Sequence, residues 1–418
     1  MRILSLAPTS FFGDYGCHVR ILEEARALQQ MGHAVTVLTY YKGKDVPGLR
    51  VIRTAPTPWR SNYEVGSSRH KYVFDVLLAA KLLTVLSHER FDIIHAHLHD
   101  GALIASVIAK LTRIPVCFDY QGSLTDEMVQ HGFVQRTWVR NISGLLERAI
   151  NRMPAAIFTS TLNAATRLRS ELGPQKRIQH LPDGVNPDNF RRDILTSQER
   201  NELRARYGIG AHEPVAVFLG LLARHQGVAN IIDAAALLKA QGKPMRWLVM
   251  GYPNISAWQQ YAAERGVAQE VVFTGRVPYE AAPRMLALGD VALAPKLSLT
   301  EGSGKLLNYM AMELPTVAFD TPTQREILGG VGVYVPMGDT VAMAEQVWQL
   351  MQQPNRAQHL GQRARLRARQ LFGWDRSATL MVQTYEQLLG IASVEYADPA
   401  EMDNRDNRDV RASKTTSI

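Results

Sequence analysis

The chain has 418 residues, 46% of them hydrophobic, and a formal net charge of +8. This length favours two domains, because one hydrophobic core rarely serves so many residues, and the sequence has no apolar run of the ~20 residues that a membrane-spanning helix needs. Two cysteines, Cys17 and Cys117, are too few for a disulfide framework, so we expect a cytoplasmic protein in which both are small buried residues.

Strand and helix patterns alternate from the N-terminus, which is typical of a doubly wound parallel sheet in an α/β protein. The opening MRILSLAP predicts a strand rather than a signal peptide. Residues from about 40 to 68 are polar and irregular, so we predict no regular element there. The predicted strands of this first series are 3–7, 34–39, 92–96, 115–118, 155–159 and 178–181, and the predicted helices are 17–31, 71–86 and 101–111.

Residues 136–153 place arginines beside apolar side chains at helical spacing. We expect a packed surface helix there, with a membrane-surface helix as the alternative. Residues 1–190 hold 22 Lys and Arg against 16 Asp and Glu, a bias that suits anionic lipid or phosphorylated ligands as well as a solvated basic surface. No basic run is interleaved with aromatic residues, so nucleic acid is not an expected partner. The arginines are Arg136, Arg140, Arg148 and Arg152, beside Trp138, Ile142, Leu145 and Ile150.

The pattern breaks at Pro182-Asp183-Gly184, and the polar segment 186–200 is the predicted linker. A second series follows, with strands at 215–220, 247–251, 271–274, 291–295 and 316–319 and helices at 228–240, from 305 to before Pro315, and at 378–389. We therefore predict an N-terminal domain over 1–186, a C-terminal domain over 187–372, a last helix over 373–391 and a disordered tail over 392–418.

A glycine-rich turn at 301–306 has features of a phosphate-binding turn. Gly302 and Gly304 let the backbone approach a ligand closely, and the free N–H groups at the start of a helix beside Lys305 favour an anion. The turn alone is weak evidence, because many α/β proteins use such a turn for structural reasons.

Five segments of the chain, taken in their order along the sequence, resemble the retaining glycosyltransferases of family four. That family has the GT-B fold, in which two Rossmann-like domains face each other across a cleft. The resemblance covers roughly residues 1–390. It implies a nucleoside diphosphate sugar held mainly by the second domain, an acceptor held mainly by the first, and a last helix that crosses back to the first domain. The segments are FGDYGCHVRILEEARALQQMGHAVTVLT near the start, DIIHAH at 92–97, HLPDGVNPDNF at 180–190, VFLGLLARHQGV at 217–228 and the glycine-rich turn.

The resemblance implies two catalytic residues. His97 matches the family histidine that contacts the transferred sugar near its reacting carbon, and Glu301 matches the acidic residue that touches the donor sugar's hydroxyls. A neutral imidazole can orient a hydroxyl without adding charge. A core histidine and an exposed glutamate are the structural alternatives. No carboxylate pair accompanies His95, His97 and His99 at metal spacing, so we expect no zinc site.

The implied donor site departs from the family in its cations. Leu221 and Gln226 stand where the family has the arginine and lysine that contact the diphosphate, and Asn308 stands where it has a ribose-binding glutamate. Lys305 is the expected replacement cation, with Lys296 and Arg224 behind it. The full set of expected donor-binding residues is Gly13, Gly16, Gly220, Arg224, Gln226, Lys296, Gly302, Ser303, Gly304, Lys305, Leu306 and Asn308.

Acceptor contacts are expected from the first domain. Asp14 lies in the first glycine turn, and Gln121, Ser123 and Glu127 lie in the loop after the strand that ends at Phe118. Helix capping is the structural alternative for Asp14, and for Ser123 with Glu127.

The expected reaction moves a hexose from a nucleoside diphosphate sugar to a hydroxyl acceptor with retention, in glycolipid or polysaccharide synthesis. No metal cofactor is expected, since no DxD motif follows a strand. Three rivals remain: another GT-B enzyme such as a nucleotide-sugar epimerase or a phosphorylase, a non-catalytic nucleotide-sugar binding module, and a dinucleotide oxidoreductase, which the absence of G-x-G-x-x-G after the first strand disfavours. Peripheral contact with the inner face of an anionic membrane is a hypothesis from charge.

Overall fold

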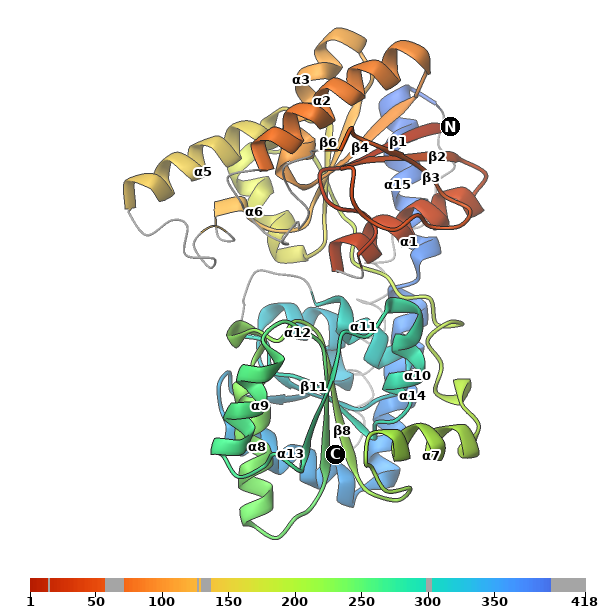
Figure 1. Cartoon of the computed structure of the whole chain (residues 1–418). Coiled ribbons are helices and arrows are strands. Elements are labelled where there is room, and N and C mark those ends of the chain that lie inside the picture. Colours follow the sequence, from red (N-terminus) through yellow and green to blue (C-terminus); the bar gives the residue numbers. More distant parts are fainter. Residues whose placement is uncertain (14–15, 57–70, 126–127, 129–136, 298–302, 392–418) are drawn as a thin grey trace, which may run out of the picture.

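The computed structural model describes residues 1–13, 16–56, 71–125, 128, 137–297 and 303–391. Two parallel sheets dominate it, one built from each half of the chain, with helices on both faces of each (Figure 1). Among the described residues no helix is long and apolar enough to cross a membrane. The predicted disordered tail, 392–418, lies outside the described residues.

The N-terminal sheet has seven strands in the order β3-β2-β1-β4-β5-β6-β7. Its central strands are buried along their whole length, because helices cover both faces. The carboxyl ends of β4 and β5 therefore reach the same edge of the sheet, where His97 pairs with Asp119 in register. The strands are β1 (Arg2–Ala7), β2 (Ala34–Thr39), β3 (Arg50–Arg53), β4 (Ile93–His97), β5 (Val116–Tyr120), β6 (Ala156–Thr159) and β7 (Arg177–His180).

Two groups of helices enclose this sheet. On one face, α1 (Gly16–Gln30) packs beside the last helix of the fold, α15 (Trp374–Leu389). On the other face lie α2 (Lys71–His88), α3 (Leu98–Thr112), α5 (Thr137–Arg152) and α6 (Leu162–Leu172). In Figure 1, α5 extends sideways from the body of this half.

The C-terminal sheet has six strands in the order β10-β9-β8-β11-β12-β13. One hydrophobic cluster lies on each face of this sheet, and helices α11 and α14 share one cluster while α8 and α13 share the other. The strands are β8 (Val215–Leu219), β9 (Arg246–Met250), β10 (Val271–Gly275), β11 (Val291–Ala294), β12 (Thr316–Phe319) and β13 (Val333–Val335). The helices are α7 (Ser197–Arg206), α8 (Val228–Ala240), α9 (Ile255–Glu264), α10 (Ala282–Leu286), α11 (Gly304–Ala311), α12 (Pro322–Leu328), α13 (Thr340–Gln352) and α14 (Pro354–Leu371).

The chain passes between the two halves twice, and the two crossings touch. Val185 forms a parallel bridge with Gly373, and its N–H donates to the carbonyl of Phe372 at 2.8 Å. A Cβ on Gly184 would lie 2.5 Å from the ring of Trp374, so only glycine fits there. From this point α15 runs back over the N-terminal sheet and buries Tyr385 in its core.

Three sequence predictions are wrong in detail. Strand β3 lies in the stretch predicted to be irregular; it has four residues, too few to show a period. Helix α7 begins inside the predicted linker and extends beyond its end, and a capping box between Thr196 and Glu199 starts it. Its sequence is almost wholly polar, so apolar periodicity could not reveal it. Cys117 is buried as predicted, whereas Cys17 is only half-buried.

Candidate active site

His97 ends β4, and both of its ring nitrogens have protein partners. Its Nδ1 lies 3.0 Å from a carboxylate oxygen of Asp119, and its Nε2 lies 2.9 Å from the hydroxyl of Ser5. Because a carboxylate can only accept, Nδ1 carries the proton and Nε2 accepts from Ser5 when the ring is neutral. The next residue, Leu98, has a φ of 59°, so the chain turns sharply as it leaves the strand for α3.

Asp119 is the centre of this site. Its side chain is fully buried, and Arg20 donates to both of its oxygens at 2.8–3.0 Å. Gln121 donates to the same carboxylate at 2.7 Å, so this predicted acceptor residue joins His97 around Asp119. Burial alone would raise the pKa of Asp119, but the charge of Arg20 and the hydrogen bonds from His97 and Arg20 outweigh it and lower that pKa strongly.

Arg20 joins three parts of the chain. Its guanidinium contacts Glu24 in α1 at 3.0 Å and Asp119 in β5 at 2.8 Å, and Nη1 donates to Asp183 at 2.8 Å. Asp183 belongs to the first crossing between the two halves. Burial raises the pKa of Glu24 well above its usual value, against the opposing charge of Arg20. Arg20, Glu24 and Asp119 were not predicted as site residues from the sequence.

In the structure, two carboxylates lie beside His95 and His97, although the sequence did not predict them. Ligand atoms of Glu24, His95, His97 and Asp119 lie within 4.8 Å of one another, a grouping that could hold a metal ion. The expectation that no carboxylate pair accompanies these histidines is therefore wrong, because α1 and β5 supply one from distant segments. The cation already in contact with both carboxylates is Arg20, so a metal ion would have to compete with the guanidinium.

His95 connects this cluster to the last helix. Its Nδ1 lies 2.6 Å from the hydroxyl of Tyr385 in α15, and its ring stacks on that of His97 with centroids 4.6 Å apart. Burial, with the neighbouring His97, lowers the pKa of His95 well below its usual value, so the ring is neutral near pH 7.

A second polar cluster holds the loop after β5. Glu147, on the inner side of α5, accepts hydrogen bonds from the hydroxyl of Ser123 and the backbone N–H of Thr125, both at 3.0 Å, and from the hydroxyl of Tyr120 at 3.1 Å. His99 lies 3.8 Å from the same carboxylate. Glu127, the expected partner of Ser123, lies outside the described residues. Glu147 takes that place in the structure, and it was not predicted because it lies in a different predicted helix.

The predicted donor residues meet at the start of α11. Lys305 Nζ donates to Oε1 of Gln226 at 2.8 Å and lies 4.2 Å from the centroid of the Phe218 ring. The same ammonium is 3.0 Å from the position that a Cβ on Gly220 would take, so glycine leaves room for it. Two predicted residues of segment 217–228, Gly220 and Gln226, therefore adjoin the ammonium of a third, Lys305, which comes from the glycine-rich turn.

The other predicted donor-binding residues differ in how far they are buried. Lys296, Ser303 and Leu306 are buried, Lys305 and Asn308 are half-buried, and Arg224 is exposed. The hydroxyl of Ser303 has no hydrogen-bond partner among the residues that the structure describes, which leaves a buried polar atom at the start of α11. Glu301 and Gly302 lie outside the described residues.

The two sides of the site approach each other at Asp183. A Cβ on Gly304 would lie 3.7 Å from a carboxylate oxygen of Asp183, and that carboxylate also accepts from Arg20. On the first loop, the carbonyl of Gly13 accepts from Arg276 of the C-terminal half at 2.8 Å. Gly16 opens α1 with open space around its Cβ position, and Asp14 lies outside the described residues.

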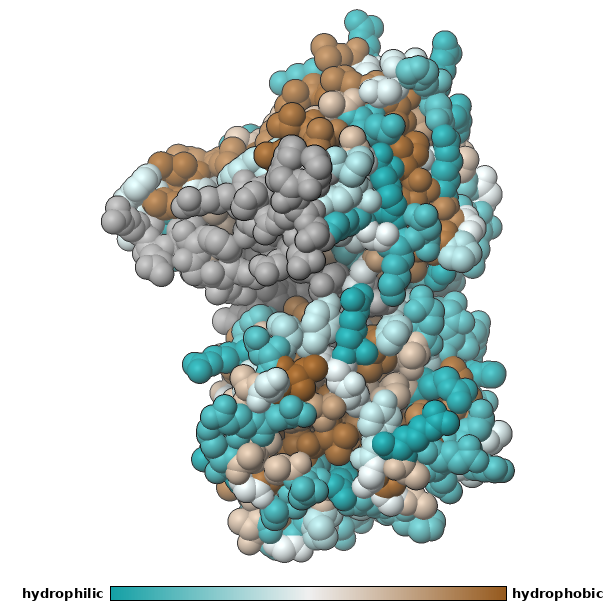
Figure 2. Space-filling model, viewed as in Figure 1, coloured by the Kyte–Doolittle hydropathy of each residue, from teal (hydrophilic) through white to brown (hydrophobic). Residues whose placement is uncertain are grey.

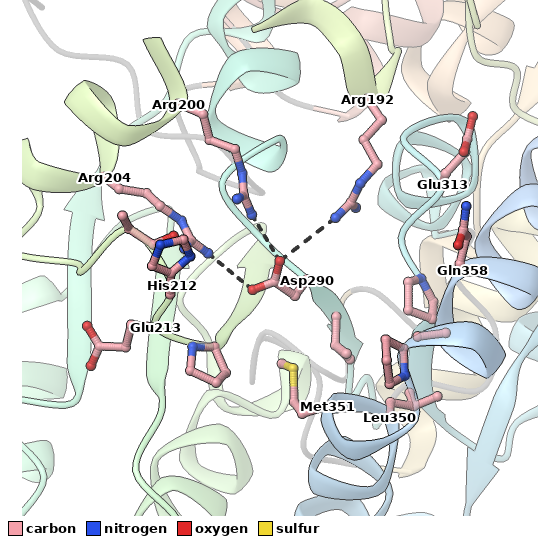
Figure 3. Close-up of a pocket in the computed structure, with 16 residues that line it drawn as sticks. Arg192, Arg200, Arg204, His212, Glu213, Asp290, Glu313, Leu350, Met351 and Gln358 are labelled. Atoms are coloured by element: carbon pink, nitrogen blue, oxygen red, sulfur yellow. Dashed lines mark hydrogen bonds and ion pairs between the residues drawn. The ribbon is translucent and has the colours of Figure 1, made fainter. Parts of the chain in front are cut away.

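A separate cavity of about 540 Å³ opens where β8 and β11 begin, away from these residues (Figure 3). Arg192, Arg200 and Arg204 converge there on Asp290, at 3.8, 2.9 and 3.1 Å. Arg204 also donates to the carbonyl of Leu288 at 2.9 Å, and Asp290 accepts from a backbone N–H of β8. The cluster therefore fastens α7 to the sheet.

Comparisons with known proteins agree on one family. A model described as glycosyl transferase 4-like domain matches residues 15–184, and a model described as glycosyl transferases group 1 matches residues 213–353. The chain is 28% identical to the 2-deoxystreptamine glucosyltransferase of Streptomyces kanamyceticus over 89% of its own length and 99% of the relative's. It is 31% identical to a GDP-mannose-dependent phosphatidylinositol monomannoside mannosyltransferase of Mycolicibacterium smegmatis, over 52% of this chain and 58% of that one.

Solved structures share the fold. Sucrose-phosphate synthase from Thermosynechococcus elongatus superposes with a TM-score of 0.77 at 18% identity, over 93% of this chain and 99% of that one. The Anabaena protein HepE in complex with UDP and glucose gives 0.74 at 15% identity, over 93% and 100%. The chain belongs to the group 1, family 4 glycosyltransferases, and its two parallel sheets are the two Rossmann-like halves of a GT-B enzyme.

Proposed function

We propose that this glycosyltransferase moves a hexose from a nucleoside diphosphate sugar to a hydroxyl acceptor, with retention at the anomeric carbon and without a metal ion. The observation that carries the proposal is the meeting of Lys305, Gln226 and Gly220 at the start of α11. An ammonium beside the N-terminus of a helix suits a diphosphate, because both stabilise the negative charge that develops as the sugar leaves.

The first half supplies the acceptor side of the proposed reaction. Asp119 fixes the tautomer of His97 and the orientation of Gln121, so both are held at one strand edge. In the proposed step the bond from the anomeric carbon to the diphosphate oxygen breaks, and the acceptor oxygen bonds to that carbon from the same face. The acceptor proton passes to the departing phosphate oxygen. For His97 to orient a sugar hydroxyl, that hydroxyl would have to replace Ser5 at Nε2, and His97 itself would form no covalent bond.

The names of similar proteins support a nucleotide sugar as donor. One relative is GDP-mannose-dependent, and HepE was solved with UDP-glucose, so both uracil and guanine donors are candidates. The relatives' names include 2-deoxystreptamine and phosphatidylinositol monomannoside as acceptors. Glycolipid or polysaccharide synthesis at the inner face of an anionic membrane is the proposed setting, which the net positive charge also supports.

A donor panel tests the proposal. The melting temperature is measured with UDP, GDP and ADP sugars, because a ligand that binds only the folded protein raises it by mass action. One base should stabilise the protein clearly more than the others, with or without EDTA. The matching donor is then incubated with candidate acceptors, and the anomeric configuration of the product is read by NMR. Lack of stabilisation by every nucleotide sugar would reject the proposal, and binding without transfer to any acceptor would favour a non-catalytic module.

A further inference from the structure

Helix α5 has its polar side turned inward and its apolar side turned outward. Four side chains of α5 are buried, and three of them are polar: Ser143, Glu147 and Asn151, with Ile150 as the apolar one. Glu147 and Ser143 lie one helical turn apart on the inner face. The large apolar side chains on the opposite face are more than half exposed, which is the reverse of a normal surface helix. Those side chains are Trp138, 60% exposed, Ile142, 56%, Leu145, 63%, and Leu146, 51%.

The exposed charges of α5 all have one sign. Arg140, Arg148 and Arg152 are exposed, and the helix carries a single carboxylate, Glu147, which is buried on the inner face. An apolar stripe flanked by arginines is typical of helices that lie in a membrane surface, where the apolar side chains enter the acyl region and the guanidinium groups reach the phosphates. Figure 2 shows hydrophobic residues along the outer side of α5.

The apolar surface continues onto the neighbouring helices. Helix α3 packs against both α2 and α5. Tyr72 and Val76 of α2 and Val107 and Leu111 of α3 are at least half exposed, and Figure 2 shows hydrophobic residues over this part of the molecule. An exposed apolar surface that spans three adjacent helices marks an interaction site rather than ordinary surface variation.

The three acidic residues of the described helices α2, α3 and α5 are each engaged by another side chain of the protein. Asp75 of α2 accepts from Tyr40 and Asp100 of α3 pairs with Lys71, while Glu147 faces inward. In a two-fold symmetric dimer this surface would meet itself, so arginines would face arginines with no carboxylate between them. An anionic bilayer offers both the negative headgroups and the apolar layer that the surface lacks.

We propose that the outer face of α5, with the adjoining apolar side chains of α2 and α3, docks on an anionic lipid surface. The inner face of the same helix holds the loop after β5 through Glu147 and its bonds to Ser123 and Thr125. This second step rests on the proposed function: if that loop binds the acceptor, docking brings acceptor recognition to the membrane surface.

Vesicle binding tests the docking. The full chain is sedimented with vesicles of phosphatidylcholine and with vesicles of phosphatidylcholine mixed with phosphatidylglycerol. We expect binding to the mixed vesicles only, weakened by salt. The double variant Arg148→Ala with Arg152→Ala should bind roughly 30-fold more weakly, since each arginine near an anionic surface contributes several-fold. The double variant Ile142→Ser with Leu145→Ser should lose binding to a similar degree.

Matched controls come from the C-terminal half. Leu366 and Arg206 are exposed side chains there, and Leu366→Ser with Arg206→Ala should bind like the wild type. Circular dichroism and thermal stabilisation by the nucleotide sugar confirm that every variant is folded. Wild-type binding by both α5 variants would overturn the proposal. So would a wild-type dimer that the serine variants dissociate, since the surface would then belong to a second copy. Retained donor stabilisation with no vesicle binding would overturn only the docking.

Discussion

The Nζ atom of Lys305 lies 2.8 Å from the Oε1 atom of Gln226, although 79 positions separate the two residues in the chain. Gln226 stands where the family resemblance leads one to expect a diphosphate-binding lysine. The structure therefore brings a cation to that place from a different element, the start of α11, and Gly220 leaves the space for it. This arrangement makes the position of one positive charge a testable property of the site.

Replacing Lys305 with alanine should lower kcat/KM about 10²- to 10³-fold, because one preorganised donor to a developing oxyanion contributes that much. The exchange Lys305→Gln with Gln226→Lys keeps one cation and one amide at the same contact, so it should recover most of the loss. Steady-state kinetics with the donor found in the melting panel measure both variants. Arg206→Ala, at an exposed residue of α7 outside the proposed site, is the matched control. If the alanine variant kept full activity, Lys305 would not stabilise the diphosphate of the donor.

Asp119→Asn should cost about 3 kcal/mol of unfolding free energy, since it leaves the buried Arg20 short of a counter-charge. The lowered pKa of Asp119 means that its stabilisation is full above about pH 4 and is lost as the pH falls through the lower folded value. The wild type should therefore lose stability in acid more steeply than the variant, as measured by urea unfolding. Asp45→Asn removes an exposed ion pair with Arg53 and should cost less than about 1 kcal/mol.

His99 should make the protein less stable below neutral pH. Burial lowers the pKa of His99 to about 4, so between about pH 6.5 and 4 the unfolded chain binds a proton that the folded chain does not. Stability should fall as the pH drops through this window, and His99→Gln should reduce the slope. It will not abolish the slope, because the pKa of His95 is lowered as well. His359→Gln, at an exposed histidine, should leave the slope unchanged; an equal slope in the His99 variant would contradict the assignment.

Asp290→Asn should lower the melting temperature without changing kcat. The variant leaves Arg192, Arg200 and Arg204 close together with no carboxylate between them. Because Asp290 is about one-third exposed, the loss should be nearer 2 kcal/mol than the value for a fully buried pair. Differential scanning calorimetry measures it, and Asp193→Asn, at an 80% exposed side chain, is the control. A fall in kcat with an unchanged melting temperature would contradict a purely structural role.

The sequence predicted the strands better than it predicted the charge networks. Helix α8 and strand β12 have the bounds that their apolar patterns predicted, because tertiary packing buries the side that the pattern marks. Arg20 and Glu147 could not be predicted this way, since a charged residue in a helix pattern indicates a solvent-facing position. Their partners lie 99 and 24 positions away in the chain, and only the folded sheet brings them together.

For the proposed donor site, the sequence patterns marked segments that the fold brings together, but not the contacts between them. Gly220, Gln226 and Lys305 were all predicted, yet their meeting at one ammonium depends on how β8 and α11 pack. The orientation of α5 could not be predicted from the sequence for the same reason. Its arginines and apolar residues were evident as a pattern, but which face the protein buries is set by Glu147 and the loop that it holds.

The contact between Val185 and Gly373 bears on how the two halves of the enzyme can move. Two crossings that are hydrogen-bonded side by side form a short flat ribbon rather than two independent tethers. Such a ribbon bends more easily than it twists. We therefore expect the two halves to open and close by hinge rotation about a single axis rather than to slide or rotate freely. Trp374, which packs against Gly184, would limit the range of that hinge rotation.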